Sequence, residues 1–186
     1  MEIDELIESF NFFIKNEADK IQYSINNNTE IKSNFFEKKT MYYSKDYGEK
    51  LLFSNLIGTL GIYFFIINED VYLNFSDVYN YNECAMGGKI NMYHYKEIKL
   101  KKNDCFYLGS ATSNSLYTRL NQHFKKSENY HSLHLSETKR KMLSDKMIIY
   151  AFPVKNKNYK HINVLLKSIE LELHKRFNPI AGGKNI

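Results

Sequence analysis

The sequence predicts an α+β domain, and three features of the chain lead to that prediction. Residues 57–67 form a run that is apolar nearly throughout, as expected for a central strand covered on both faces. Two more β-favouring runs, CFYLG at residues 105–109 and MIIYAFPV at residues 147–154, predict further strands. Apolar residues recur at helical spacing over residues 2–24 and 161–177, which predicts one helix in each of these segments.

The composition is that of a folded domain with enough apolar residues to bury a core. The chain has 186 residues, of which 43% are hydrophobic and 15% aromatic, and this composition excludes a disordered protein. Its apolar runs are too short to span a bilayer, and the acidic opening MEIDELIESF is unlike the basic start of a signal peptide. We therefore expect a cytoplasmic protein with no membrane partner. The net charge of +5 is compatible with a polyanionic partner but does not require one.

The two cysteines, Cys84 and Cys105, do not belong to a CxxC pair. Two cysteines cannot form a cysteine-based zinc site by themselves, and disulfides are uncommon in the cytosol. We expect both to be buried thiols.

Two stretches of the chain predict no definite element. NNNTE at residues 26–30 ends the first helix, and the region from there to about residue 56 mixes tyrosines with lysines. Residues 68–104 carry short β-like pieces broken by Asn, Asp and Gly-Gly, and they end in the basic segment KEIKLKKND.

A helix is predicted directly after the second strand. Ser113 or Asn114 can cap it, and it would run to about residue 126. Arg119 and His123 lie four residues apart and therefore share one face of this helix. There Arg119 could clamp a phosphate, and His123 could hydrogen-bond the same group or carry a proton. The alternative, commoner for such residues taken by themselves, is a solvated arginine beside a histidine at the rim of the core.

LHLSETKRKML at residues 133–143 predicts a turn and a short helix before the third strand. The last helix would end at Asn178 and Pro179. Glu170 and Glu172 flank its apolar stripe on opposite sides. A carboxylate at the edge of that stripe can hold a divalent metal, because hard cations prefer oxygen ligands, or it can be an ordinary solvated glutamate. Periodicity alone does not choose between the two.

Tyr63 and Tyr107 each lie in a β-favouring run beside a glycine, Gly61 and Gly109 respectively. A glycine in a strand allows a ligand or another backbone to approach closely. Strand tyrosines taken by themselves are more often core residues with a polar tip. The order of all these residues along the chain is therefore more informative than any one of them.

In that order, the chain resembles the GIY-YIG nuclease family. GIY at residues 61–63 is similar to the first motif of the family, and YLG at residues 107–109 is similar to the second. SLYTRLNQHF at residues 115–124 resembles the helix that carries the family's arginine. IELELHKRFNPIAGGK at residues 169–184 resembles its metal-binding helix and proline ending. The resemblance covers about residues 57–184.

The resemblance implies a particular architecture. A small central, mainly antiparallel β-sheet would be flanked by helices, and residues 57–186 would form the nuclease core. Residues 1–56 would form an N-terminal helical arm. Residues 68–104 would be an insertion between the two motif strands, where the family usually has a tight hairpin, and it would serve substrate recognition.

The resemblance also implies a role for each residue of the site. Glu170, whose spacing to the proline ending fits the family better than that of Glu172, would bind Mg²⁺ or Mn²⁺. Tyr63 and Tyr107 would line the site, and one of them would help to activate the attacking water. Arg119 would hold the scissile phosphate. The companion residue one turn later on its helix, His123, would assist as a hydrogen-bond partner or as a proton shuttle.

The chain departs from the family pattern at two positions of the site. Ser110 stands where members often carry a lysine just after the glycine of the second motif. The family's late asparagine would fall near Gly182. Either no residue of this chain fills its role, or Asn178, Lys184 or Asn185 does so.

The resemblance implies a metal-dependent endonuclease that hydrolyses double-stranded DNA, and several basic segments would meet its phosphates. Such a short chain is most similar to the restriction endonucleases of the family, which would make it a homodimer acting on a short site. A non-restriction nuclease of a phage or mobile element is an alternative. A catalytically degenerate DNA-binding module is another, and a structural or partner-binding protein whose tyrosines belong only to the core is the third.

Overall fold

The structure is a computed structural model that describes residues 35–37, 39–48, 52–74, 97–125, Leu133, Leu135, 143–155 and 161–181. The predicted helix over residues 2–24, the residue Cys84 and most of the predicted turn and helix at residues 133–143 lie outside these ranges. Within them, no helix has the length and apolar character needed to cross a bilayer.

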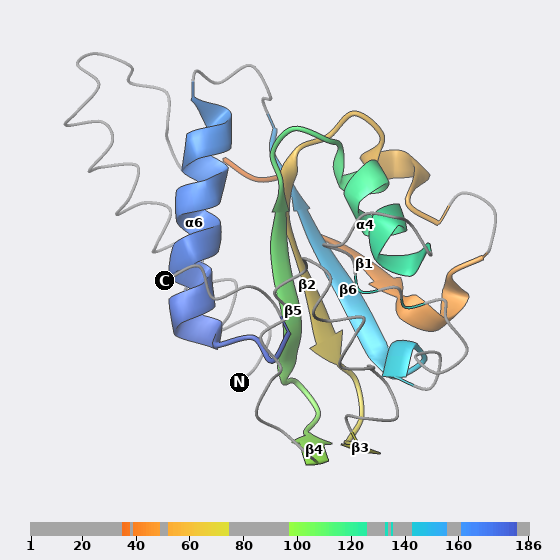
Figure 1. Ribbon diagram of the computed structural model, residues 1–186. Coiled ribbons are helices and arrows are strands. Elements are labelled where there is room, and N and C mark those ends of the chain that lie inside the picture. The colour runs from red at the N-terminus through yellow and green to blue at the C-terminus, as the bar shows by residue number, and fades with distance from the viewer. Residues whose placement is uncertain are drawn as a thin grey trace.

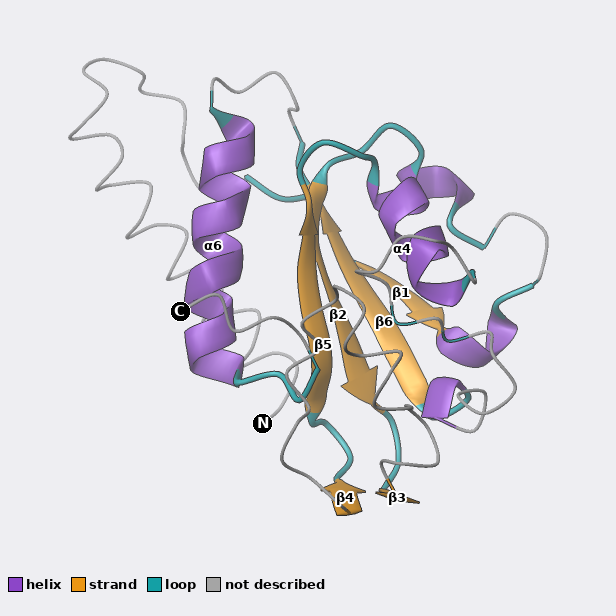
Figure 2. Cartoon of the chain, viewed as in Figure 1, coloured by secondary structure: helices purple, strands orange, loops and turns teal. Residues whose placement is uncertain are grey.

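A four-stranded sheet forms the centre of the described part, in the order β1-β6-β2-β5. Its strands are β1 (Thr40–Tyr43), β2 (Gly61–Ile67), β5 (Cys105–Ala111) and β6 (Met147–Pro153). All neighbouring strands run antiparallel. With helices on both faces (Figures 1 and 2), this arrangement confirms the predicted α+β fold.

Strand β2 lies between β5 and β6, and all seven of its residues are buried, as its continuous apolar run predicts. Its side chains alternate between two cores. Tyr63 and Phe65 belong to the core beneath α4 (Leu116–Phe124), whereas Ile62 and Phe64 belong to the core beneath α6 (Ile162–Phe177). Figure 1 shows the two helices on opposite faces of the sheet. The central strand can therefore direct residues to either helix.

The sheet extends past the predicted boundary at residue 57. Strand β1 pairs with β6, and the 3₁₀ turns η1 (Ser44–Asp46) and η2 (Ser54–Leu56) follow it. Residues of this stretch therefore contribute a strand to the sheet and side chains to its core. The four residues of β1 alternate between half-buried and exposed positions, as in a short edge strand. Such a brief pattern is hard to recognise among mixed tyrosines and lysines.

The two ends of the predicted insertion pair with each other. Strand β3 (Val71–Asn74) and strand β4 (Glu97–Leu100) form a separate antiparallel ribbon, which continues from the β2–β5 pair (Figure 2). Residues 75–96 lie outside the described part of the chain.

Helix α4 begins later than the sequence predicts. Its N-cap is Ser115 instead of Ser113 or Asn114, and the Ser115 hydroxyl oxygen accepts a bond of 3.2 Å from the Thr118 N–H. The shift arises because β5 continues to Ala111, so the turn that joins strand to helix takes up the two earlier candidates.

The outer edge of β5 is partly covered by the segment that follows α6. The Ile180 N–H donates to the Cys105 carbonyl at 3.1 Å, and the Ala181 N–H donates to the Phe106 carbonyl at 2.7 Å. Tyr107 and Ala181 form a parallel bridge. Cys105 itself is buried, as predicted. The described tail thus occupies the first half of this edge strand and leaves the second half, with Gly109 and Ser110, for other contacts.

Candidate active site

The glycines of the two motifs are required by close contacts. A Cβ atom added at Gly61 would lie 2.2 Å from the Phe152 carbonyl oxygen, so β2 and β6 could not approach as they do. A Cβ atom added at Gly109 would lie 2.5 Å from the Tyr63 hydroxyl oxygen. Tyr63 faces Gly109 across the β2–β5 pair. Its phenol therefore crosses the β5 backbone at the glycine of the second motif.

The hydroxyl of Tyr63 forms a buried hydrogen bond with His123. Tyr63 Oη lies 2.8 Å from His123 Nε2, and both side chains are fully buried. The other ring nitrogen, Nδ1, accepts a bond of 3.2 Å from the Leu133 N–H. Because a backbone N–H can only donate, Nδ1 carries no proton, and in the neutral ring Nε2 carries it. His123 therefore donates to the oxygen of Tyr63.

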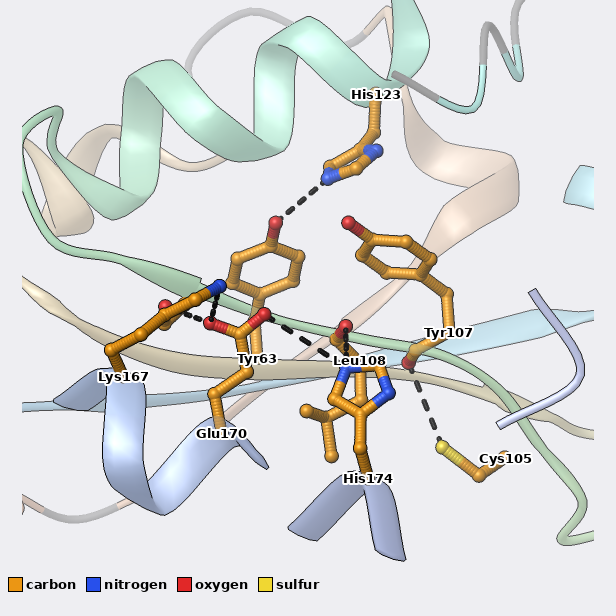
Figure 3. Close-up of polar contacts among 9 residues, drawn as sticks. Tyr63, Cys105, Tyr107, Leu108, His123, Lys167, Glu170 and His174 are labelled. Carbon is orange, nitrogen blue, oxygen red and sulfur yellow. Dashed lines mark hydrogen bonds and ion pairs between the residues drawn. The ribbon is translucent and has the colours of Figure 1, made fainter. Parts of the chain in front are cut away.

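Tyr107 lies beside this pair. It faces Phe65 across the same two strands, and its ring is 6.1 Å from that of Tyr63 and 4.7 Å from that of His123, measured between centroids. Figure 3 shows both phenols rising from the sheet toward His123. The two tyrosines and the histidine thus form one aromatic cluster beneath α4.

The electrostatic environment keeps both phenols protonated at neutral pH. Burial raises the pKa of Tyr63 well above its ordinary value, and the charges of Tyr107 and Glu170 raise it further. The Arg119 guanidinium lowers this pKa by its charge and by hydrogen bonding, but does not offset the effect of burial. The pKa of Tyr107 is raised for the same main reason and is likewise lowered in part by Arg119. Arg119 therefore lies close enough to act on both phenols.

Glu170 approaches the sheet from α6, on the other face. The Ser110 hydroxyl donates to Glu170 Oε2, and Lys167 Nζ lies 2.9 Å from the same oxygen. Ser110 directly follows Gly109 in β5, so Tyr63 and Glu170 contact consecutive residues of this edge strand. The structure thus brings the predicted residues to one edge of the sheet from both of its faces.

His174 is a neighbour of Glu170 that the sequence analysis did not consider. Its Nε2–H donates to the Leu108 carbonyl at 3.1 Å, and the same nitrogen lies 3.9 Å from Glu170 Oε1. Burial lowers the pKa of His174, although the Glu170 charge and the bond to Leu108 oppose this. The residue could have been recognised from its position four places after Glu170, one turn along the same helix face.

Glu172, the alternative carboxylate, lies elsewhere. It pairs with Lys175 at 3.0 Å, and 44% of its side chain is exposed, whereas only 12% of the Glu170 side chain is exposed. Asn178 is exposed and serves as the C-cap of α6 in a left-handed conformation, with its N–H donating to His174. Lys184 lies outside the described residues. The helix thus turns Glu170, and not Glu172, toward the sheet.

The donors around Glu170 fit one mode of divalent metal binding. No group of three or more His, Cys, Asp or Glu residues gathers within the part of the chain that the structure describes. Mg²⁺ is commonly bound by one or two carboxylates together with water and substrate phosphates. The two hydrogen bonds that the described residues donate to Glu170 fall on Oε2, whereas Oε1 lies 3.9 Å from His174 Nε2, so Oε1 is the better placed oxygen for such an ion. Glu170 therefore fits a site with a single carboxylate that the phosphate completes.

The comparisons with known proteins agree with this geometry. A family model described as the GIY-YIG catalytic domain matches residues 61–161. Neither the curated proteins nor the solved structures gave a match. The matched region contains both motif strands, α4 and β6, and the four residues Tyr63, Tyr107, Arg119 and His123, whereas Glu170 lies beyond it.

Proposed function

The chain belongs to the GIY-YIG nuclease family, and from this we propose that it is a metal-dependent endonuclease that hydrolyses phosphodiester bonds of double-stranded DNA. One observation carries the proposal. Tyr63 and Glu170, which come from opposite faces of the sheet, reach consecutive residues of the edge strand β5. The effects of Arg119 and Glu170 on the pKa values of both tyrosines support the proposal, because they indicate that a carboxylate, two phenols and a guanidinium lie close to one another.

Each residue has a role in this proposal. Arg119 binds a non-bridging oxygen of the scissile phosphate through its planar fork. Glu170 would hold Mg²⁺ or Mn²⁺, and the ion would supply positive charge that stabilises the negative charge developing on the phosphate. Tyr63 and Tyr107 orient the attacking water, and they enter the reaction as neutral phenols because burial raises their pKa.

His123 acts on the reaction through Tyr63. Its Nδ1 accepts from Leu133, so its Nε2–H is a donor to the phenol oxygen in the neutral tautomer. A donor at this place stabilises a phenolate when the phenol loses its proton. The geometry therefore favours the hydrogen-bond role of His123 over that of a proton shuttle.

We further propose a restriction endonuclease that acts in the cytoplasm as a homodimer on a short site. The predicted insertion supports a role in DNA recognition, because Lys99 is exposed on its β3–β4 ribbon and the exposed Lys101 and Lys102 follow that ribbon just before the motif strand β5. Lys99 Nζ lies 5.0 Å from the centroid of the exposed Tyr72 ring. Cations and aromatic rings of this kind can contact phosphates and bases.

Incubation of the purified protein with plasmid DNA and Mg²⁺ tests the proposal. Discrete fragments would support a site-specific restriction enzyme, and a smear would support a nuclease without that specificity, such as one from a phage or mobile element. Intact plasmid together with salt-dependent DNA binding would instead support a catalytically degenerate binding module. This is the second candidate because Ser110 stands where members of the family often carry a lysine.

A further inference from the structure

A cation that belongs to none of the sequence motifs lies at the candidate site. Lys167 Nζ is 2.9 Å from Glu170 Oε2, the oxygen to which Ser110 also donates (Figure 3). The Lys167 side chain is 52% exposed, whereas that of Glu170 is 12% exposed. The ammonium therefore lies between the partly buried carboxylate and solvent.

A second pair on the same helix shows how Lys167 differs from an ordinary surface lysine. Lys175 lies 3.0 Å from Glu172, also three residues away, but those side chains are 75% and 44% exposed. Exposed pairs of this kind contribute little energy and fix little geometry. The partner of Lys167 is instead held against β5 by Ser110. Lys167 is thereby tied to the edge strand that carries the second motif.

The donors of Lys167 are suited to a phosphate. An ammonium group has three N–H donors, and the bond to Glu170 uses one of them. The half-exposed position leaves the others available to a molecule that approaches β5 from solvent. Arg119 lies beneath α4 on the opposite face of the sheet, where it acts on both phenols. A DNA backbone crossing the strand at Gly109 and Ser110 would thus meet a cation from each helix.

We propose that Lys167 is a catalytic residue of this chain, which binds a phosphate oxygen of the DNA beside Glu170. It supplies from α6 the ammonium group that members of the family often carry just after the second motif, where this chain has Ser110. The inference rests on the proposed nuclease function, because it assigns a further residue to the same site.

Lys167→Met and Lys175→Met form a matched pair for the test, because both remove an ammonium that pairs with a glutamate three residues away on α6. Two quantities are measured for each variant and for the original protein: the rate of plasmid cleavage with Mg²⁺, and the affinity for a DNA duplex without divalent metal over a series of salt concentrations. Lys167→Met is expected to lower the cleavage rate at least about tenfold. It should also reduce the slope of log affinity against log salt by about one phosphate contact. Lys175→Met should leave both quantities unchanged.

Equal cleavage and equal salt slopes for Lys167→Met and the original protein would overturn the inference. So would equal losses in the two variants, because they would indicate a general effect of charge. If the original protein cleaves no DNA, the proposed nuclease function fails, whereas the salt slopes still decide whether Lys167 contacts phosphate. Both lysines are exposed, so thermal unfolding midpoints close to that of the original protein are expected and verify that the variants fold.

Discussion

Tyr63 Oη and His123 Nε2 lie 2.8 Å apart in the buried centre of the candidate site, and the Leu133 N–H fixes which of them donates. This hydrogen bond joins the first motif to the arginine helix, and its direction is set by a backbone group outside both. A phenol held in this way has its oxygen oriented by a donor before any substrate binds. A change to this bond should therefore alter both DNA cleavage and the unfolding free energy.

Removal of the His123 ring should affect both stability and cleavage. In His123→Ala the buried oxygen of Tyr63 and the Leu133 N–H each lose the hydrogen bond to the imidazole, which should cost about 1–3 kcal/mol of unfolding free energy. His123→Gln retains an amide donor of similar reach and should recover part of the cleavage rate. Urea unfolding and plasmid cleavage measure the two effects. Equal cleavage by His123→Ala and the original protein would exclude a role of this bond in the reaction.

Alanine at the two motif glycines should have different consequences. In Gly109→Ala the new Cβ would meet the Tyr63 hydroxyl oxygen, at the end of a side chain, so the phenol would move and cleavage would fall in a folded protein. In Gly61→Ala the Cβ would meet the Phe152 carbonyl, a backbone atom of the central sheet, so the fold itself should fail. Circular dichroism and thermal unfolding distinguish the two. Normal cleavage by a well-folded Gly109→Ala would contradict the close contact.

Glu170→Gln should abolish metal-dependent cleavage and retain DNA binding. The amide preserves the shape of the side chain but lacks the charge that a divalent cation requires, so a loss of at least about 10²-fold is expected. Glu172→Gln is the control, because Glu172 pairs only with the exposed Lys175 among the described residues. If both variants cleave DNA equally well, Glu170 is not the metal ligand.

The stability of the protein should depend on pH through His174. Burial lowers the pKa of this residue in the folded state, so the unfolded chain binds the proton more readily. The stability that His174 contributes is therefore present above its unfolded pKa of about 6.5 and is lost as pH falls below it. His174→Gln keeps a donor for the Leu108 carbonyl but does not titrate.

Urea unfolding at pH 7.5 and at pH 5.5 tests this dependence. The unfolding free energy of the original protein should fall more between the two values than that of His174→Gln. His161→Gln serves as the control, because His161 is exposed at the start of α6, and it should behave like the original protein. Identical changes in all three proteins would show that folding does not shift the pKa of His174.

The sequence predicts the central strand, the motif strands and the final helix well, because each has a strong local pattern. Strand β2 is apolar on both faces and is buried throughout, and α6 ends at Asn178 as expected. The approach of Glu170 to the motif strands follows from the packing of α6 on β5, which no local pattern contains. Periodicity does not distinguish Glu170 from Glu172. The prediction that Glu170 is the metal ligand came from the family resemblance.

The structural features that the sequence does not predict can also be explained physically. Strand β1 has only four residues and one paired neighbour, so its pattern is too short to recognise. Lysine is common three residues from a glutamate on a helix. Lys167 differs from Lys175 in the burial of its glutamate partner and in the hydrogen bond that Ser110 donates to that partner, and neither can be read from the sequence. Leu133 acts through its backbone N–H, which the side-chain sequence does not encode.

The covering of β5 has a consequence for the behaviour of the protein in concentrated solution. The carbonyl groups of Cys105, Phe106 and Leu108 are taken by Ile180, Ala181 and His174 respectively. A strand of another molecule would find no continuous row of acceptors there, so ordered aggregation by strand addition is disfavoured at this margin of the sheet. The segment that follows α6, together with His174 of that helix, thus protects this edge strand from pairing with a second molecule.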